Sequence, residues 1–223
     1  MGPNQEFKNE LDLLIDHHLL PCGDDVLLRH DRAVALETVR ILEQAGPADW
    51  ERPTPCARWN LRALVSHMAG QNVGFAAAAD GDGADPRHWQ PLPLGDGDSP
   101  VAAYRTTVGL VLASFARAGT AARRFDLPEI SVSRRFPATV AIGFHFLDYA
   151  VHAWDLARAI GLDWRPDDEI AEAALALARL VPDDGRRLEP GAAFSPARTG
   201  GADPARPFDL VLTTLGRSPG WTP

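Results

Sequence analysis

The chain of 223 residues has only two cysteines, Cys22 and Cys56, and a single lysine, Lys8. Two cysteines do not make the disulfide framework of a secreted domain, so we expect a reducing, cytoplasmic compartment. No apolar run approaches the roughly 20 residues of a membrane-spanning helix, so we expect no membrane partner. The N-terminal stretch MGPNQEFKNELDLLIDHH is too acidic and too polar for a secretory signal.

Positive charge is also scarce. The formal net charge is −8, and the sequence has no basic cluster. Nucleic-acid binding normally requires such a cluster, so we expect no nucleic-acid partner. Hydrophobic residues make up 45% and charged residues 23%, as in an ordinary globular protein, and the length suits one well-buried domain. We expect a small-molecule substrate, with the chain acting as a monomer or a homodimer.

Apolar residues recur at three- and four-residue intervals in four long segments, which predicts four principal helices. These segments are residues 26–45, 61–79, 100–118 and 138–160. Asn60 is suited to cap the second helix, and Ser99 followed by Pro100 is suited to open the third. Gly161 is suited to the position just after the fourth. The helix boundaries are therefore marked by local sequence as well as by periodicity.

The connecting segments differ from the helices in composition. Residues 80–98 are rich in Gly, Asp and Pro and predict a long crossover loop. Residues 125–136 alternate enough for a small hairpin, although Pro128 and Pro137 limit its extent. Residues 166–181 predict a fifth helix, with acids in its first turn and an arginine late, as the helix dipole favours.

These elements predict an all-α fold: a four-helix bundle with a long crossover, one extra C-terminal helix and a small irregular or β element. We expect residues 26–223 to form this single domain, and residues 1–25 to be an N-terminal extension or a short helix. The C-terminal stretch 208–221 predicts a short helix or strand that packs back onto the body. The crossover loop and residues 183–207 are expected to form a pocket rim, because they are long and poor in regular structure.

Three side chains that could hold one metal ion lie in two of the predicted helices. Asp148 and His152 are four residues apart, which places them one turn apart on the same helix face. His67, from the second helix, could supply a third ligand and leave coordination positions open, as catalytic metal sites require. His145 lies on the same face as Asp148 and His152 and is a further candidate ligand.

Each of these patterns, taken alone, also fits ordinary hydrogen-bonded side chains. Asp155 could orient a metal-bound histidine through its other ring nitrogen. Cys56 could approach the site as a thiol, although free cysteines are usually small buried apolar residues. Trp59 and Trp154 are expected to be core or wall residues, because aromatic side chains dominate packing area.

Two sequence blocks together resemble a known family. PTPCARWNLRALVSHMAG (53–70) and, some eighty residues later, DYAVHAWDLARAIG (148–161) look like the DinB/mycothiol-dependent maleylpyruvate isomerase superfamily, in its actinobacterial metal-binding branch. The resemblance runs over about residues 29–221 and includes GDGDSPVAAYR at the third helix and the terminal LGRSPGW. It implies a DinB-like four-helix bundle with a long crossover.

The resemblance also implies a divalent metal held by His67, Asp148 and His152. The mycothiol isomerase has glutamate where this chain has Asp148, whose side chain is one methylene shorter. Zinc is the first expectation, and nickel, iron or cobalt also suit two imidazoles and a carboxylate. His145 has no secure place in the family pattern.

A thiol or water in the open coordination position would be activated by the cation. The family resemblance implies that the thiol is mycothiol and that the reaction is S-conjugation or cis–trans isomerisation of a small electrophile. Arg62 and Arg158 are candidates for binding a substrate carboxylate, or else structural partners of bundle acids. The alternatives are a non-catalytic bundle that binds metal or a small ligand, and a biosynthetic lyase or hydrolase that uses no thiol.

Overall fold

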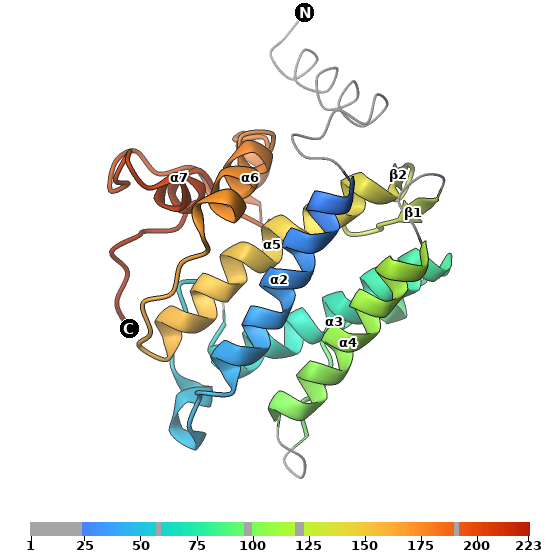
Figure 1. The fold of residues 1–223 in the computed structure, drawn as a ribbon, viewed down its shortest axis with the longest axis horizontal. Coiled ribbons are helices and arrows are strands. Elements are labelled where there is room, and N and C mark those ends of the chain that lie inside the picture. Colours follow the sequence, from blue (N-terminus) through green and yellow to red (C-terminus); the bar gives the residue numbers. More distant parts are fainter. Residues whose placement is uncertain (1–23, 57–58, 96–99, 119–122, 190–191) are drawn as a thin grey trace, which may run out of the picture.

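A computed structural model of the chain describes residues 24–56, 59–95, 100–118, 123–189 and 192–223. These residues contain six α-helices and one two-stranded sheet (Figure 1). The fold is therefore all-α with a small β element, as the sequence predicts. The expected N-terminal extension or short helix falls almost wholly on residues 1–23, which lie outside the described part of the chain.

Four long helices form the body of the domain. They are α2 (Asp24–Leu42), α3 (Leu61–Asp80), α4 (Pro100–Ala118) and α5 (Ala138–Ala159). Helix α2 packs along α5, and α3 packs along α4 (Figure 1). The interior between them is filled by large side chains that are fully buried, among them Tyr104, Phe115, Phe146 and Trp154.

The helix ends follow the expected local chemistry. The Asn60 side chain accepts a hydrogen bond of 2.9 Å from the backbone N–H of Ala63, which caps α3. Gly161, after α5, has a φ of +80°, a left-handed conformation that favours glycine, and the N–H of Leu162 donates back to the carbonyl of Ala157. The predicted cap at Ser99 lies outside the described residues.

The predicted crossover folds closely onto α3. It contains a short 3₁₀ helix, η2 (Pro86–Trp89), and the indole N–H of Trp89 donates to the carbonyl of Gly83. Two glycines one turn apart on α3 permit this approach. A Cβ at Gly70 would lie 2.2 Å from the carbonyl oxygen of Gln90, and one at Gly74 would lie 2.4 Å from the Trp89 ring.

The predicted hairpin is present between α4 and α5. Strands β1 (Arg124–Asp126) and β2 (Arg135–Pro137) pair antiparallel, with Phe125 opposite Phe136. Pro137 ends β2 and directly precedes α5, and Pro128 lies in the connecting turn, so the prolines limit the strands to three residues each. The turn lies against α3, where the side chain of Gln71 binds that of Glu129.

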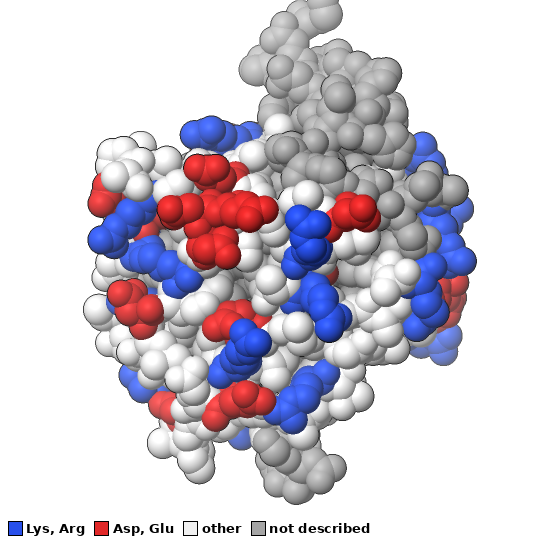
Figure 2. Space-filling view, in the orientation of Figure 1, with Lys and Arg blue, Asp and Glu red and all other residues white. Residues whose placement is uncertain are grey.

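The C-terminal part adds helices α6 (Asp168–Ala178) and α7 (Pro207–Thr214), which pack against each other. The stretch 208–221, expected as helix or strand, is thus helical at its start. Short 3₁₀ helices η1 (Pro47–Glu51) and η3 (Gly185–Leu188) complete the described elements. On the face seen in Figure 2, acidic side chains gather in one group at the upper left, and basic side chains lie around it and over the rest of the face. Among the described helices, none combines the length and the apolar character required to cross a membrane.

Candidate metal centre

The three predicted ligands lie together. His67 comes from the second turn of α3, and Asp148 and His152 come from α5, with one donor atom of each within 4.8 Å of the others. Nε2 of His152 is 3.4 Å from Oδ1 of Asp148. Two donors that each lie about 2.1 Å from a tetrahedral ion are about 3.4 Å apart, so this separation fits a shared cation.

The cluster is buried on one side and accessible on the other. His152 is 3% exposed, whereas His67 and the Asp148 carboxylate are partly exposed. Trp59 stacks on the His67 ring with the ring centroids 4.4 Å apart, and its centroid is 6.5 Å from that of His152. Trp59 therefore forms a wall of the site, which agrees with its expected role.

The second nitrogen of His152 is held by a buried carboxylate. Nδ1 of His152 is 3.0 Å from Oδ2 of Asp155, and Arg217 donates to both oxygens of Asp155, at 3.2 and 2.9 Å. Burial lowers the pKa of His152, but the charges of Asp148 and Asp155 outweigh it and leave that pKa above its ordinary value. Burial raises the pKa of Asp155, but Arg217 and His152 outweigh it and hold that pKa below its ordinary value.

Arg217 is a site residue that sequence reasoning missed. It lies 62 residues beyond Asp155, and the signal that could have found it is the terminal block LGRSPGW, which contains it. The arginine is 5% exposed. Cys56 is also buried. Its burial agrees with the expectation of a small buried residue, and an approach to the site as a thiol stays a prediction.

His145 lies on the expected face of α5 but not in the cluster. Its Nδ1 is 2.6 Å from Oδ1 of Asp31 on α2, and its Nε2 is 3.2 Å from Oδ1 of Asn72 on α3. The ring also stacks on Tyr149, with a centroid separation of 3.9 Å. Both nitrogens are thus engaged inside the bundle, and His145 serves packing between helices.

The two arginines proposed for substrate binding are engaged with other groups. Arg62 donates to Glu51 at 3.3 Å and lies over the ring of Trp50. Arg158 donates to the carbonyl of Trp221 at 3.2 and 2.7 Å. Neither contact places a guanidinium on the metal cluster, and a role in substrate binding stays a prediction for both.

A carboxyl group on the hairpin turn is a second feature that the sequence did not reveal. Glu129 accepts a hydrogen bond of 2.9 Å from Gln71, which lies one turn beyond His67 on α3. Glu129 is exposed as a whole residue, but partial burial of its carboxyl group raises its pKa. The Gln71 hydrogen bond opposes this rise in pKa, and the negative charge of Asp148 adds to it. Glu129 is therefore within electrostatic reach of the metal cluster.

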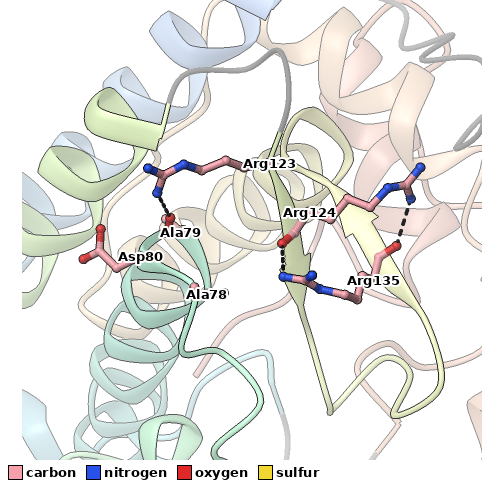
Figure 3. A pocket seen from close by; sticks show the side chains of 7 residues that line it. Ala78, Ala79, Asp80, Arg123, Arg124 and Arg135 are labelled. Atoms are coloured by element: carbon pink, nitrogen blue, oxygen red, sulfur yellow. Dashed lines mark hydrogen bonds between the residues drawn. The ribbon is translucent and has the colours of Figure 1, made fainter.

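A separate hollow of about 420 Å³ lies at the C-terminal end of α3, beside Asp80 (Figure 3). Arginines of the hairpin line it. Arg123 donates to the carbonyl of Ala79 at 3.0 Å, and Arg124 and Arg135 donate to each other's carbonyls, at 3.3 and 2.9 Å. These contacts fasten the hairpin to itself and to α3, about four turns away from the metal cluster.

Comparisons with known proteins agree with the fold and the sequence blocks. Residues 32–157 match the family described as the mycothiol maleylpyruvate isomerase N-terminal domain. The uncharacterised proteins Rv0738 and MT0763 of Mycobacterium tuberculosis, strains H37Rv and CDC 1551, are each 33% identical to this chain over 164 residues, which is 70% of this chain and 79% of theirs.

A crystal structure of a histidine-to-alanine mutant of the mycothiol-dependent maleylpyruvate isomerase has a similar fold. Its TM-score is 0.52 at 13% identity, over 70% of this chain and 68% of that one. The resemblance inferred from the two sequence blocks is thus confirmed. The chain belongs to the mycothiol maleylpyruvate isomerase N-terminal domain family, and its fold is the DinB-like helical bundle.

Proposed function

We propose that this protein is a metal-dependent enzyme in which His67, Asp148 and His152 hold a divalent cation. The observation that carries the proposal is the convergence of their donor atoms from two helices, within 4.8 Å of one another. Three protein ligands with one accessible side are typical of catalytic rather than structural metal sites. Zinc is our first choice, and two imidazoles with one carboxylate also suit nickel, iron or cobalt.

The cation would supply the positive charge that deprotonates a low-molecular-weight thiol, or water, at neutral pH. The residues around it support such a step. Asp155 keeps a proton on Nδ1 of His152 and so leaves Nε2 available as a ligand atom. Trp59 covers one side of the His67 ring and keeps water from that side. Glu129, whose pKa is raised in part by the charge of Asp148, is our candidate for the group that holds or releases a proton near the cluster.

We further propose that the thiol is mycothiol and that it adds to a small electrophile. The support is membership of the family and the name of the isomerase that shares the fold. Addition alone would give an S-conjugate. Addition, rotation about the former double bond and elimination of the thiol would give cis–trans isomerisation, with the thiol returned unchanged.

Metal analysis of the purified protein tests the centre. We expect about one equivalent of bound divalent metal in the wild type and strong loss in His67→Ala and His152→Ala, since each removes one of three ligands. His88→Ala is the matched control, because His88 pairs with Asp82 at the surface, away from the cluster. Unchanged metal content in both ligand variants would refute the ligand set.

Turnover assays test the chemistry. The metal-loaded protein is incubated with mycothiol and a panel of small unsaturated electrophiles, and conjugates and isomers are detected by mass spectrometry and chromatography. Products that require both metal and thiol would support the proposal. Products formed without thiol would indicate a lyase or hydrolase, and a metal-loaded protein that turns over nothing would indicate a binding bundle.

A further inference from the structure

We propose that Asp155 and Arg217 form a positioning pair that makes the C-terminal segment, residues 207–221, a support of the metal centre, so that metal binding and docking of this segment strengthen each other. The inference rests on the proposed metal centre. Neither residue would touch the ion or the substrate. Both would act through His152.

The first step is the orientation of His152. A carboxylate can only accept hydrogen bonds, so the 3.0 Å contact with Asp155 places the imidazole proton on Nδ1. In the neutral ring the other nitrogen, Nε2, then carries the lone pair that a cation requires, and it lies 3.4 Å from Oδ1 of Asp148. A ligand histidine with this second hydrogen bond has a fixed tautomer and a fixed ring plane.

The second step is the hold that Arg217 has on Asp155. Its Nε donates to Oδ1 and its Nη2 to Oδ2, a two-point contact that fixes the carboxylate plane as well as its position. Asp155 is wholly buried and Arg217 is 5% exposed. Arg217 is the arginine that compensates the buried charge of Asp155. Without it, the Asp155 carboxylate would be less stable in its buried position and free to tilt away from His152.

The third step is the position of Arg217 in the chain. It follows α7 closely, just after Gly216, which has a φ of +81° and allows the close approach of Ser195. Beyond it, the carbonyl of Trp221 is held by Arg158 of α5. Among the described hydrogen bonds, the segment is therefore held on α5 at two places. Arg217 binds Asp155, which contacts His152. Trp221 binds Arg158, which has no described hydrogen bond to His152.

Because binding free energies are linked, a contact that improves metal affinity must be strengthened by metal in turn. If the docked segment presets His152 for the cation, the cation must stabilise the docked segment. The segment also has a second anchor, since Arg165 pairs with the buried Asp209 of α7. Among the described hydrogen bonds and ion pairs, that anchor does not lead to His152, so it offers a matched comparison.

The experiment compares R217Q, R217K and R165Q with the wild type as full-length, folded proteins. Zinc affinity is measured by competition with a chromophoric chelator. We expect R217Q to bind zinc roughly 10- to 100-fold more weakly, as loss of an outer partner of a ligand histidine typically does. R217K keeps the charge but not the two-point contact and is expected to fall between. R165Q is expected to match the wild type.

Hydrogen exchange supplies the reciprocal measurement. Zinc should increase protection of residues 207–221 in the wild type and in R165Q, but not in R217Q. Wild-type zinc affinity in R217Q would overturn the proposal. An equal loss in R165Q would also overturn it, because general loosening of the segment would then explain the effect.

One readout separates this proposal from the metal centre itself. In metal-free protein, ¹⁵N imidazole shifts report which nitrogen of His152 carries the proton. The comparison is made at a pH above the pKa of His152, where the ring is neutral and carries one proton; there the wild type should show Nδ1–H and R217Q a mixture of tautomers. If the wild type binds no zinc, the metal centre fails and the linkage with it. If zinc binds but the tautomer is the same in both proteins, the positioning pair alone fails.

Discussion

The Nδ1 atom of His145 lies 2.6 Å from Oδ1 of Asp31, and both side chains are fully buried. The pair joins α5 to α2. It is separate from the metal cluster, although His145 lies on the same helix as Asp148 and His152. Replacing His145 by Ala would leave the Asp31 carboxylate buried without this partner. We expect a loss of about 3–5 kcal/mol in the free energy of unfolding, measured by urea denaturation.

The same variant discriminates between the two roles considered for His145. Zinc bound per folded molecule should be unchanged in His145→Ala, measured under conditions that keep the variant folded. A folded variant that had lost its metal would instead make His145 a ligand. The double variant Asp31→Ala/His145→Ala should recover part of the lost stability, because it leaves no buried polar group without its partner at this position.

A second prediction concerns the contact between the crossover and α3. Alanine in a helix is normally favoured over glycine by roughly 1 kcal/mol. At Gly70 the new Cβ would lie 2.2 Å from the backbone oxygen of Gln90. A backbone atom cannot move away as easily as the end of a flexible side chain. We expect Gly70→Ala to lower the free energy of unfolding by about 1–3 kcal/mol, in the range of other overpacked cores.

Gly109 supplies the control for that prediction. It lies in the middle of α4, is exposed, and a Cβ there would meet nothing within 4 Å. Gly109→Ala should therefore raise the free energy of unfolding by about 0.5–1 kcal/mol. If both variants were stabilised, the crossover would not be packed against Gly70 in solution.

A third prediction uses the pH dependence of stability through Glu129. Its pKa is raised by burial and by the charge of Asp148, against the hydrogen bond from Gln71. The folded protein therefore keeps this proton to higher pH than the unfolded chain does. As pH rises from the ordinary glutamate pKa of 4.5 toward the folded pKa, the unfolded chain loses the proton first, and the stability contribution of Glu129 is lost.

The measurement is the free energy of unfolding of metal-free wild type and Glu129→Gln at pH values of about 4 and about 7. The amide oxygen introduced by this substitution can still accept from Gln71, so the variant keeps the contact and loses only the titration. The wild type should lose stability relative to the variant between the two pH values. A gain with rising pH would show that Glu129 is instead stabilised in its charged form.

Much of the fold could be predicted from the sequence because its signals are local. Apolar spacing indicated the four long helices, and Asn60 and Gly161 marked two of their ends. The pair of Asp148 and His152 was predictable for the same reason, since four residues in a helix fix their relation. The family resemblance was needed to favour His67 as their third ligand, because the sequence of one helix does not show which other helix packs against it.

What the sequence could not show depended on partners from elsewhere in the chain. His145 shares a helix face with Asp148, yet the positions of Asp31 and Asn72 on other helices turn it to a different role. The sequence suggests Asp155 as a partner of the ligand histidine, but the partner of Asp155 itself, Arg217, follows a different helix. Glu129 lies in a turn, and its position against α3 could not be predicted because a turn has no periodic pattern of apolar residues.

The bundle consists of two helix pairs, α2 with α5 and α3 with α4 (Figure 1). His67 belongs to one pair, whereas Asp148 and His152 belong to the other. An ion shared by these three side chains would link the two helix pairs directly. Binding of the ion would therefore restrict movement of one pair relative to the other, in addition to the buried contact of His145 with Asn72 across the same boundary.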